Sequence, residues 1–514
     1  MRRFWAVIAL PLTGLAVLNT PIASVSGRSV EVSMEELRDR IRGGTLGHML
    51  GDLNGLKHEM KYIAEPGNVH VYVPALPEGA WTDDDTDFEW VYLTEMQRTG
   101  LLVIPYARIA TLWKEHINRR IWCANEYARQ LMDLGISPPF TGKPALNPWS
   151  DFNISGQFVC ESFGLVAPGL PQTAAKLGLH YTHVTIDGEP AQATQLFTAM
   201  ISTAFFERDI DRILDAGMAA LDPKSVVHRI VADVRAWHKR HPADWRATRR
   251  LIKEKYTRYD GAERDRNGCE LNTAAVIGAV LYGQGDFITT AVHAFNLGWD
   301  ADNNAATACT VIGVRKGYRW MMARKWDIKD FYKNTSRDDM PAGETITGFA
   351  DRILALADGA IAEGGGEKVV RNGETFYRIP LQPPKNVEPL TDSDSQFADL
   401  RSGFRSEIES NVLSSSIPAE KARAAYMAIC LDWANALRTN HPTHWAQALA
   451  TLEGIPRLMQ LLFFPRVPSG VVLRDRAVAA GLRAPARHSD DSDDAGDHLA
   501  ADSTGPPSFP AHQR

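Results

Sequence analysis

Cysteine is scarce in this chain of 514 residues, which contains five. They form no CxxC pair and their number is odd, so the sequence excludes a disulfide scaffold and a zinc site built from cysteine pairs. Basic charge is also short, since 56 Lys and Arg stand against 62 Asp and Glu, a net charge of −6. A dedicated nucleic-acid binder needs a basic face that neutralises phosphates, so we expect no nucleic-acid partner.

Long apolar runs are missing except at the amino terminus. Arg2 and Arg3 precede an apolar stretch, Phe4–Leu18, and small and polar residues follow it, which is the order of a secretory signal. A bilayer-spanning helix needs about 20 apolar residues, so an uncleaved membrane anchor is the less favoured interpretation. The sequence therefore predicts a signal peptide at 1–27 and a secreted or periplasmic protein with no stable membrane span after cleavage.

The carboxyl end has little to bury. From Val467 onward the chain is rich in Arg, Asp, Ser, Pro and Gly, and His488–His498 has the sequence HSDDSDDAGDH. This composition predicts a disordered tail at 467–514. A cation-binding acidic run is the alternative, although such runs are more often simply solvated.

Helical periodicity fills the region between these ends. Apolar side chains recur three and four residues apart, and alternating strand patterns are nearly absent. One such segment, Leu112–Leu134, is expected as a single helix. Four glycines, Gly43, Gly44, Gly47 and Gly51, lie on the first helix. Glycine costs about 1 kcal/mol against alanine in a helix interior, so they indicate close approach by a neighbouring helix or a ligand.

The folded part divides into three predicted units. A helical domain is expected at 33–362, a hairpin and linker at 363–393, and a further helical segment at 394–466. The hairpin is predicted at Lys368–Ile379, because apolar pairs flank an Asn-Gly turn, and the proline-rich piece after it indicates the linker.

Acidic side chains concentrate in two distant segments. Trp81–Asp87 has the sequence WTDDDTD, with four carboxylates within five residues. Such a group stays ionised only if it is solvated or a cation neutralises it, and this segment alone leaves both interpretations open. The second segment, Gly298–Asn304, has the sequence GWDADNN and opens an apolar helix. A buried helix rarely begins with two carboxylates and two amides unless they bind something.

The type of cation follows from the donors. Both segments fit the start of a calcium loop, but Gly at position six and Glu at position twelve are missing, so an EF-hand is excluded. The remaining Asp, Thr and Asn oxygens, without His or Cys, suit Mg²⁺ or Mn²⁺ better than Zn²⁺.

A third, weaker signal follows the glycine-bearing helix. Asp52 lies in the sequence GDLNG, and Glu59 comes seven residues later. Alone, Asp52 is more simply a helix cap and Glu59 a surface residue.

Together the three segments resemble the ADP-ribosylglycohydrolase family, which includes the dinitrogenase-reductase-activating glycohydrolases and the ADP-ribosyl-arginine and ADP-ribosyl-serine hydrolases. Arg40–Gly55 is similar to the family's opening helix, WTDDDTD to its first metal motif, and Gly298–Thr307 to its second, in the same order and separation. The resemblance covers about Glu35 to Ala362. It implies an all-α orthogonal helical bundle with two Mg²⁺ ions in a central cleft.

The resemblance also implies roles for particular residues. The metal ligands fall on Thr82, Asp83, Asp84, Asp300, Asp302 and Asn303. Glu59 matches the catalytic acid/base carboxylate of some members. The substrate-binding positions fall on Asp52, Gly156, Gln157 and His183.

Two departures from the family pattern matter. Asn303 stands where a hydroxyl residue is common, which weakens the expectation for one metal site. Asp85 is an extra carboxylate, so the ligands among Asp83, Asp84 and Asp85 stay open by one position.

Two hypotheses follow for function. The resemblance implies a Mg-dependent glycohydrolase that cleaves the ribosyl C1″ linkage of an ADP-ribosylated protein or of a small ribosylated compound. The alternative is a non-catalytic protein that keeps the fold and binds ADP-ribose or metal. The intact Asp pairs and Glu59 favour the enzyme, and the acceptor (Arg, Ser or a small molecule) stays open.

Overall fold

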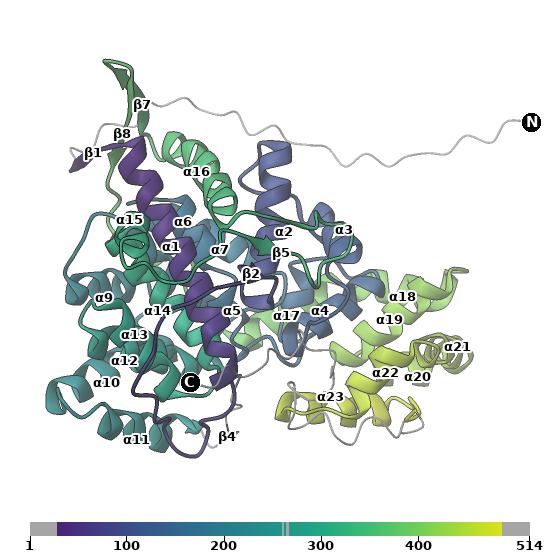
Figure 1. Ribbon diagram of the computed structural model, residues 1–514. Helices are drawn as coiled ribbons and strands as arrows, with labels where there is room; N and C mark the ends of the chain where they lie inside the picture. Colours follow the sequence, from purple (N-terminus) through teal and green to yellow (C-terminus); the bar gives the residue numbers. More distant parts are fainter. Residues whose placement is uncertain (1–27, 260–261, 264–266, 486–514) are drawn as a thin grey trace, which may run out of the picture.

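Helices dominate the computed structural model, which describes residues 28–259, 262–263 and 267–485 (Figure 1). The main body consists of α1 (Met34–Gly55), α2 (Asp84–Thr99), α3 (Tyr106–His116), α4 (Cys123–Asp133), α5 (Ser155–Phe158), α6 (Glu161–Val166), α7 (Pro171–Thr182), α8 (Glu189–Ala204), α9 (Ile210–Ala219), α10 (Val226–Arg240), α11 (Trp245–Tyr256), α12 (Cys269–Gly283), α13 (Phe287–Leu297), α14 (Ala301–Lys316), α15 (Tyr318–Met322) and α16 (Ile346–Glu363), with 3₁₀ turns at Leu56–His58 and Phe140–Gly142. The predicted all-α class is confirmed.

The predicted signal peptide at 1–27 lies outside the described residues. Within 28–259, 262–263 and 267–485, no helix has the length and apolar character needed to cross a membrane.

Three small sheets accompany the helices. Their strands are β1 (Ser29–Ser33), β2 (Ala80–Trp81), β3 (Arg258–Tyr259), β4 (Ala262–Glu263), β5 (Tyr332–Lys333), β6 (Gly343–Glu344), β7 (Glu367–Arg371) and β8 (Glu374–Pro380). The predicted hairpin is present as β7 and β8, and its turn residues Asn372 and Gly373 have φ of 52° and 82°, as a two-residue hairpin turn requires. Strand β1 was not predicted, and it pairs antiparallel with β8.

The proline-rich segment after the hairpin is bound to the main body along its length. The N–H of Gln382 donates to the carbonyl of Gly169 over 3.0 Å, and the N–H groups of Val387 and Glu388 both donate to Oε1 of Gln195. The segment therefore follows the surface of the bundle.

The single helix expected at Leu112–Leu134 is wrong. Helices α3 and α4 are separated by 117–122, where Arg120 has a left-handed φ of 50°. The apolar periodicity continues across this break because Ile117 and Ile121 are buried in the connection itself. The break matters for function, since it turns Arg120 and Trp122 toward the cavity described below.

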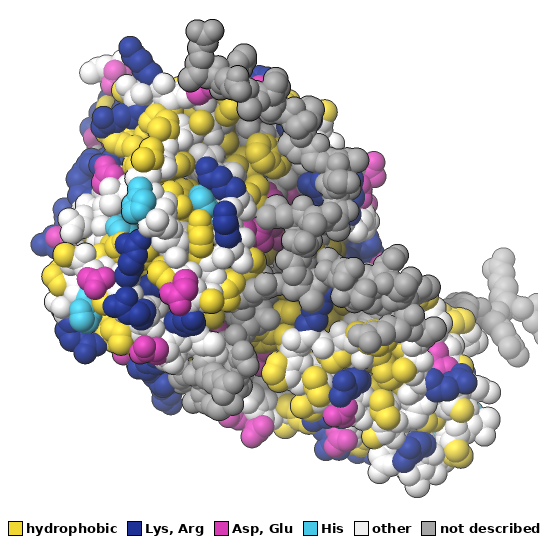
Figure 2. Space-filling view, turned by 60° about the horizontal axis from the view of Figure 1, so that its bottom comes forward, with side chains coloured by type: hydrophobic (Ala, Val, Ile, Leu, Met, Phe, Trp, Pro, Cys, Tyr) yellow, Lys and Arg dark blue, Asp and Glu magenta, His cyan; other side chains and the backbone are white. Residues whose placement is uncertain are grey.

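The carboxyl-terminal helices form a lobe beside the main body (Figure 2). They are α17 (Ser393–Gly403), α18 (Arg405–Ser414), α19 (Pro418–Cys430), α20 (Ala434–Asn440), α21 (Pro442–Glu453), α22 (Pro456–Phe463) and α23 (Pro468–Ala479). The tail was predicted to begin at 467, which is too early. Helix α23 buries Leu473 and Ala477, and the indole of Trp445 donates to the carbonyl of Ala480 over 2.9 Å. Residues 486–514 lie outside the described part of the chain.

Candidate metal centre

Helices α1 and α14 pack backbone against backbone. Helix α1 carries a glycine at every fourth position up to Gly55 on the face that contacts α14. A Cβ atom at Gly51 would lie 2.3 Å from the carbonyl oxygen of Ala305, and one at Gly55 would lie 2.4 Å from the Cα of Asp302. The predicted close approach is therefore made by a neighbouring helix. It brings Asp52 of α1 beside the start of α14.

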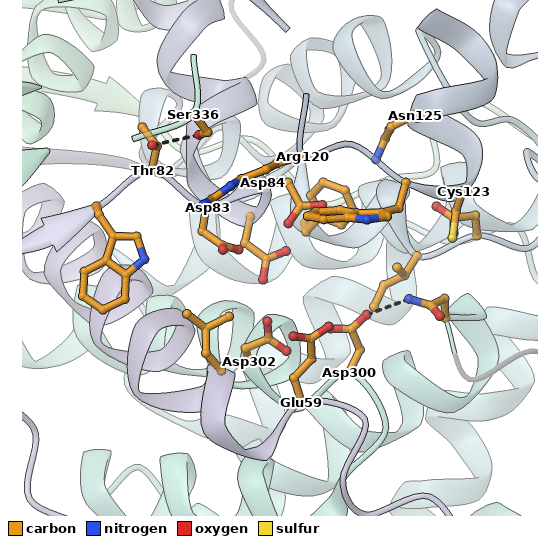
Figure 3. Close-up of a pocket in the computed structure, with 18 of the residues that line it drawn as sticks. Glu59, Thr82, Asp83, Asp84, Arg120, Cys123, Asn125, Asp300, Asp302 and Ser336 are labelled. Carbon is orange, nitrogen blue, oxygen red and sulfur yellow. Dashed lines mark hydrogen bonds between the residues drawn. The ribbon is translucent and has the colours of Figure 1, made fainter. Parts of the chain in front are cut away.

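The first acidic segment joins a short strand to a helix. Asp83 is the N-cap residue of α2, yet its side chain makes no capping hydrogen bond, although Asp commonly makes one at this position. The hydroxyl oxygen of Thr82 accepts a hydrogen bond from the N–H of Thr335 over 2.7 Å and lies 2.8 Å from the Ser336 hydroxyl (Figure 3). Thr82 thus anchors the segment, and the Asp83 carboxylate is directed to the cavity.

The second acidic segment begins α14 in the same way. Asp300 is the N-cap residue, again without a capping bond from its side chain, and Asp302 lies in the first turn. The N–H of Asp300 donates to Oδ1 of Asn272 over 3.1 Å, and the side-chain amide of Asn304 donates to the same oxygen over 2.9 Å. Asn272 therefore fixes the start of α14 and the direction of both carboxylates.

The acidic side chains meet in two groups that share one member. Within each group, one oxygen of every side chain lies within 4.8 Å of the others. The first group consists of Asp52, Asp83, Asp85 and Asp302, and the second consists of Glu59, Asp300 and Asp302. Figure 3 shows Glu59, Asp300 and Asp302 directed toward the same space as Asp83 and Asp84.

Asp52 gives the most direct evidence that these groups could hold cations. Its side chain is 0% exposed, and neither carboxylate oxygen has a hydrogen-bond partner within the residues that the structure describes. One oxygen of Asp302 is equally buried and unpartnered in that same part of the chain. A buried charge without a partner is strongly destabilising, and coordination of a cation offsets that cost. The all-oxygen donor set fits a hard divalent cation such as Mg²⁺ or Mn²⁺.

The pKa shifts agree with this conclusion. Burial raises the pKa of Asp52, Asp85 and Asp302 well above the usual range, and the neighbouring carboxylates raise it further. Burial also raises the pKa of Asp83, although the nearby Arg337 lowers it in part. These groups therefore resist ionisation until positive charge arrives, and a bound divalent cation reverses the shift.

A cavity of about 500 Å³ opens over the carboxylates. This volume is within the range of small-molecule sites. Its walls include Trp81, Arg120, Trp122, Asn125 and Arg337, of which only Trp81 belongs to a motif that the sequence showed. Two adjacent arginines inside an apolar helical pattern, at 119–120, were the available signal for part of this wall.

Arg337 explains the fourth carboxylate of the first segment. Its Nε lies 2.6 Å from Oδ2 of Asp87, and both side chains are 0% exposed. The same guanidinium donates to the carbonyl oxygens of Arg119 and Arg120 over 2.8 and 3.0 Å. Asp87 therefore orients Arg337, which holds the α3–α4 connection at the edge of the cavity.

A model of the ADP-ribosylglycohydrolase family matches residues 33–363, more than half of the chain. The chain belongs to the ADP-ribosylglycohydrolase family. No curated protein matches it. The match makes the protein a glycohydrolase of the ADP-ribosylglycohydrolase type, and it ends where α16 ends, so the carboxyl-terminal lobe lies outside the matched region.

Most predicted site residues of this ADP-ribosylglycohydrolase line the cavity, namely Glu59, Thr82, Asp83, Asp84, Asp300 and Asp302. Asp52, predicted as a substrate contact, instead belongs to the first carboxylate group. Among the three neighbouring aspartates, Asp83 and Asp85 belong to that group, and Asp84 lies beside them on the cavity wall.

Asn303 and Gln157 bind each other, and their roles as metal ligand and substrate contact stay predictions. The Asn303 side-chain oxygen accepts a hydrogen bond from the Gln157 amide, and the Asn303 NH₂ donates to Oδ1 of Asp85 over 2.8 Å. Gln157 is 0% exposed and also donates to Oδ1 of Asn304 over 3.0 Å. The predicted ligand and the predicted substrate contact thus form a hydrogen-bonded layer behind Asp85.

Gly156 and His183 are also directed elsewhere. A Cβ at Gly156 would lie 2.1 Å from the carbonyl oxygen of Pro190, so this glycine lets α5 pack against α8. His183 has Nε2 2.8 Å from Oε1 of Glu388 and Nδ1 3.1 Å from the carbonyl oxygen of Ile186. His183 is not among the residues that line the cavity, and its ring nitrogens bind the proline-rich segment and the α7–α8 turn, so its contact with substrate stays a prediction.

Proposed function

We propose that the protein is a divalent-cation-dependent hydrolase that cleaves the ribosyl C1″ linkage of an ADP-ribosylated substrate. The observation that carries this proposal is Asp302, which belongs to both carboxylate groups and has one buried oxygen without a hydrogen-bond partner in the described part of the chain. A carboxylate shared by two groups is suited to bridge two cations.

The carboxylates of the two groups come from different elements of the fold. Asp52, Asp83 and Asp85 approach Asp302 from α1 and from the start of α2, and Glu59 and Asp300 approach it from the loop after α1 and from the N-cap of α14. Two cations held here would polarise the ribose hydroxyls and a water molecule and fix their geometry. The role of the protein is therefore to place those donors, and the bound cations would keep them ionised.

Glu59 is the proposed proton-transfer group. It lines the cavity and lies in the second group with Asp300 and Asp302. Cleavage of a glycosidic bond needs one carboxyl group that delivers a proton to the leaving atom or removes one from water. Glu59 comes from the loop after α1, whereas Asp300 and Asp302 come from the start of α14. Glu59 would therefore approach the substrate from a separate element.

The part of the cavity wall formed by Trp81, Arg120 and Trp122 suits a nucleotide. Arg120 supplies a positive charge for a diphosphate, and the Trp81 and Trp122 rings supply faces on which a base stacks. A volume of about 500 Å³ accommodates a ligand of this size. These features support ADP-ribose as the recognised group, attached either to a protein side chain or to a small molecule.

The experiment is a release assay with a matched variant pair. Arginine-linked, serine-linked and small-molecule ADP-ribose conjugates are incubated with the protein in Mg²⁺, Mn²⁺ or chelator, and free ADP-ribose is quantified. Glu65 lies exposed on the same loop as Glu59, so Glu65→Gln is the control for Glu59→Gln. We expect cation-dependent release by the parent and the control alone. Binding of ADP-ribose without release from any conjugate would favour the non-catalytic alternative.

A further inference from the structure

The loop that carries Glu59 lies directly against the turn that carries Asp300. The N–H of Met60 donates to the carbonyl oxygen of Trp299 over 2.8 Å. A Cβ atom on Gly298 would lie 2.2 Å from the carbonyl oxygen of Tyr62, so the two backbones touch here. The residue after Glu59 is therefore joined to the residue before Asp300.

Both joined residues have strained backbones. Met60 has a φ of 50° and Trp299 a φ of 57°. Bulky residues rarely adopt this left-handed conformation, which is energetically unfavourable and persists only where surrounding contacts stabilise it. Other contacts must therefore stabilise the junction between Met60 and Trp299.

Arg249 of α11 contacts both sides of this junction. Its side chain is 1% exposed, and Nε donates to the carbonyl oxygen of Leu297 over 2.5 Å. The terminal nitrogen donates to the carbonyl oxygens of Tyr62 and Ile63, each over 3.1 Å. The guanidinium carbon lies 3.4 Å from the centre of the Trp299 ring.

The acceptors of these hydrogen bonds are backbone carbonyl oxygens, which are uncharged. These contacts are therefore not ion pairs. Burial lowers the pKa of Arg249 to about 9, below its usual range. The side chain is still a cation at neutral pH. One planar cation thus binds the Glu59 loop by two hydrogen bonds, the α13 terminus by a third, and Trp299 by stacking.

We propose that Arg249 is a positioning residue that builds the Glu59–Asp300–Asp302 cation group by locking the Glu59 loop onto the Asp300 turn. This inference rests on the proposed function of that group. The proposal predicts that substitution of Arg249 weakens cation binding at this group and leaves cation binding at the other group nearly unchanged. The Asp52–Asp83–Asp85–Asp302 group is fixed by the glycine contact of α1 with α14 and by the start of α2.

The test uses Arg249→Lys and Arg249→Ala in the full chain. Lysine keeps the charge but lacks the planar fork that binds two strands of backbone at once. Arg246→Lys is the matched control, because Arg246 is on the same helix, stacks on Trp245 at 4.3 Å and binds Asn68 of the same loop, but farther along it.

The first readout is Mn²⁺ titration followed by electron paramagnetic resonance. We expect two sites in the parent and in Arg246→Lys. Arg249→Lys should keep one site and lose at least about tenfold in affinity at the other, a change of about 1.4 kcal/mol. Equal weakening at both sites would indicate general destabilisation and overturn the proposal, as would unchanged binding at both.

The second readout is hydrolysis. Arg249→Lys should lower kcat by about 100-fold with KM changed much less, since a displacement of about 1 Å in a positioned group has this effect. Guanidinium ion should restore part of the Mn²⁺ binding of Arg249→Ala, whereas methylammonium should not. If the parent binds two Mn²⁺ ions and hydrolyses no conjugate, the proposed function fails and the binding readout still decides the role of Arg249.

Discussion

The side-chain amide of Asn303, in the first turn of α14, donates a hydrogen bond to Oδ1 of Asp85, in the first turn of α2, over 2.8 Å. Asn303 and Asp85 are the two positions at which the sequence departs from the metal motifs of the family. The structure therefore joins the two departures in one contact. Asp85 turns its carboxylate into the first group, and Asn303, held in place by Gln157, orients it.

This contact predicts that Asn303 and Gln157 act through Asp85. Gln157→Leu removes the donor that orients the Asn303 oxygen, so the Asn303 amide is free to rotate. We expect cation affinity to fall by about tenfold, because groups behind metal ligands typically contribute a factor of 10–100. Isothermal titration with Mn²⁺ measures this. An affinity equal to that of the parent would show that Asp85 does not need the layer behind it.

Glu59→Gln should separate binding from turnover. The amide keeps the shape and one oxygen acceptor but cannot transfer a proton, so turnover should fall by about 10²–10⁴-fold while ADP-ribose affinity stays close to that of the parent. Parallel calorimetry and release assays check both quantities. Hydrolysis at the parental rate would remove Glu59 from its proposed role.

Asp302→Ala should affect both carboxylate groups together, since Asp302 is their common member. We expect loss of cation binding, loss of turnover and a melting temperature that no longer responds to Mg²⁺ or chelator. The parent should melt at higher temperature with Mg²⁺, because a ligand that binds only the native state stabilises it by mass action. A parental melting temperature indifferent to both additions contradicts the metal centre.

A second pair of buried carboxyl groups predicts a pH dependence. Burial raises the pKa of Glu161 to about 7, and burial and the neighbouring Glu161 raise the pKa of Glu89. The native state therefore keeps a proton that the unfolded chain releases near the usual glutamate pKa. The free energy of unfolding should fall as the pH rises from about 4.5 to about 7. Urea titrations measure the free energy of unfolding at each pH in this range. Its decrease with pH should be smaller for Glu161→Gln than for the parent, and the exposed Glu363→Gln is the control. An identical slope in parent and Glu161→Gln would reject the assignment.

Helix α23 predicts the effect of two truncations. Removing 468–514 deletes the buried Leu473 and Ala477 and leaves the Trp445 indole without its acceptor, so the melting temperature of the carboxyl-terminal lobe should fall by several degrees. Removing 486–514 alone should leave it unchanged. Calorimetry of the two truncated chains compares them directly, and equal melting would mean that α23 adds no stability.

Local patterns predicted the parts of this fold that depend on neighbouring residues. The Asn372-Gly373 turn identified its hairpin, and the glycines of α1 indicated close approach by a helix or a ligand, because each requires a particular backbone. The α3–α4 break was not predictable from periodicity, since Ile117 and Ile121 are buried within the connection itself. The direction of His183 was not predictable either, because it depends on Glu388, which comes from the proline-rich segment about 200 residues later in the chain.

The candidate site shows the same limit. Residue type and spacing identified its carboxylates, whereas Arg249 and Arg337 belong to no motif that the sequence showed and gain their roles only from the carbonyl groups that the fold brings to them. A buried arginine bound to carbonyl oxygens leaves no motif in its own neighbourhood. Such residues become visible only when the packing around them is known.

The glycine contact between α1 and α14 also constrains the order of events during synthesis. Chains leave the ribosome amino terminus first, so α1 waits for its partner until most of the main body has been made. Its glycines lower its helical propensity by about 1 kcal/mol each, which makes the isolated segment a poor helix. The two halves of the candidate metal centre thus come together late, and a nascent chain holds no complete set of its carboxylates before α14 docks.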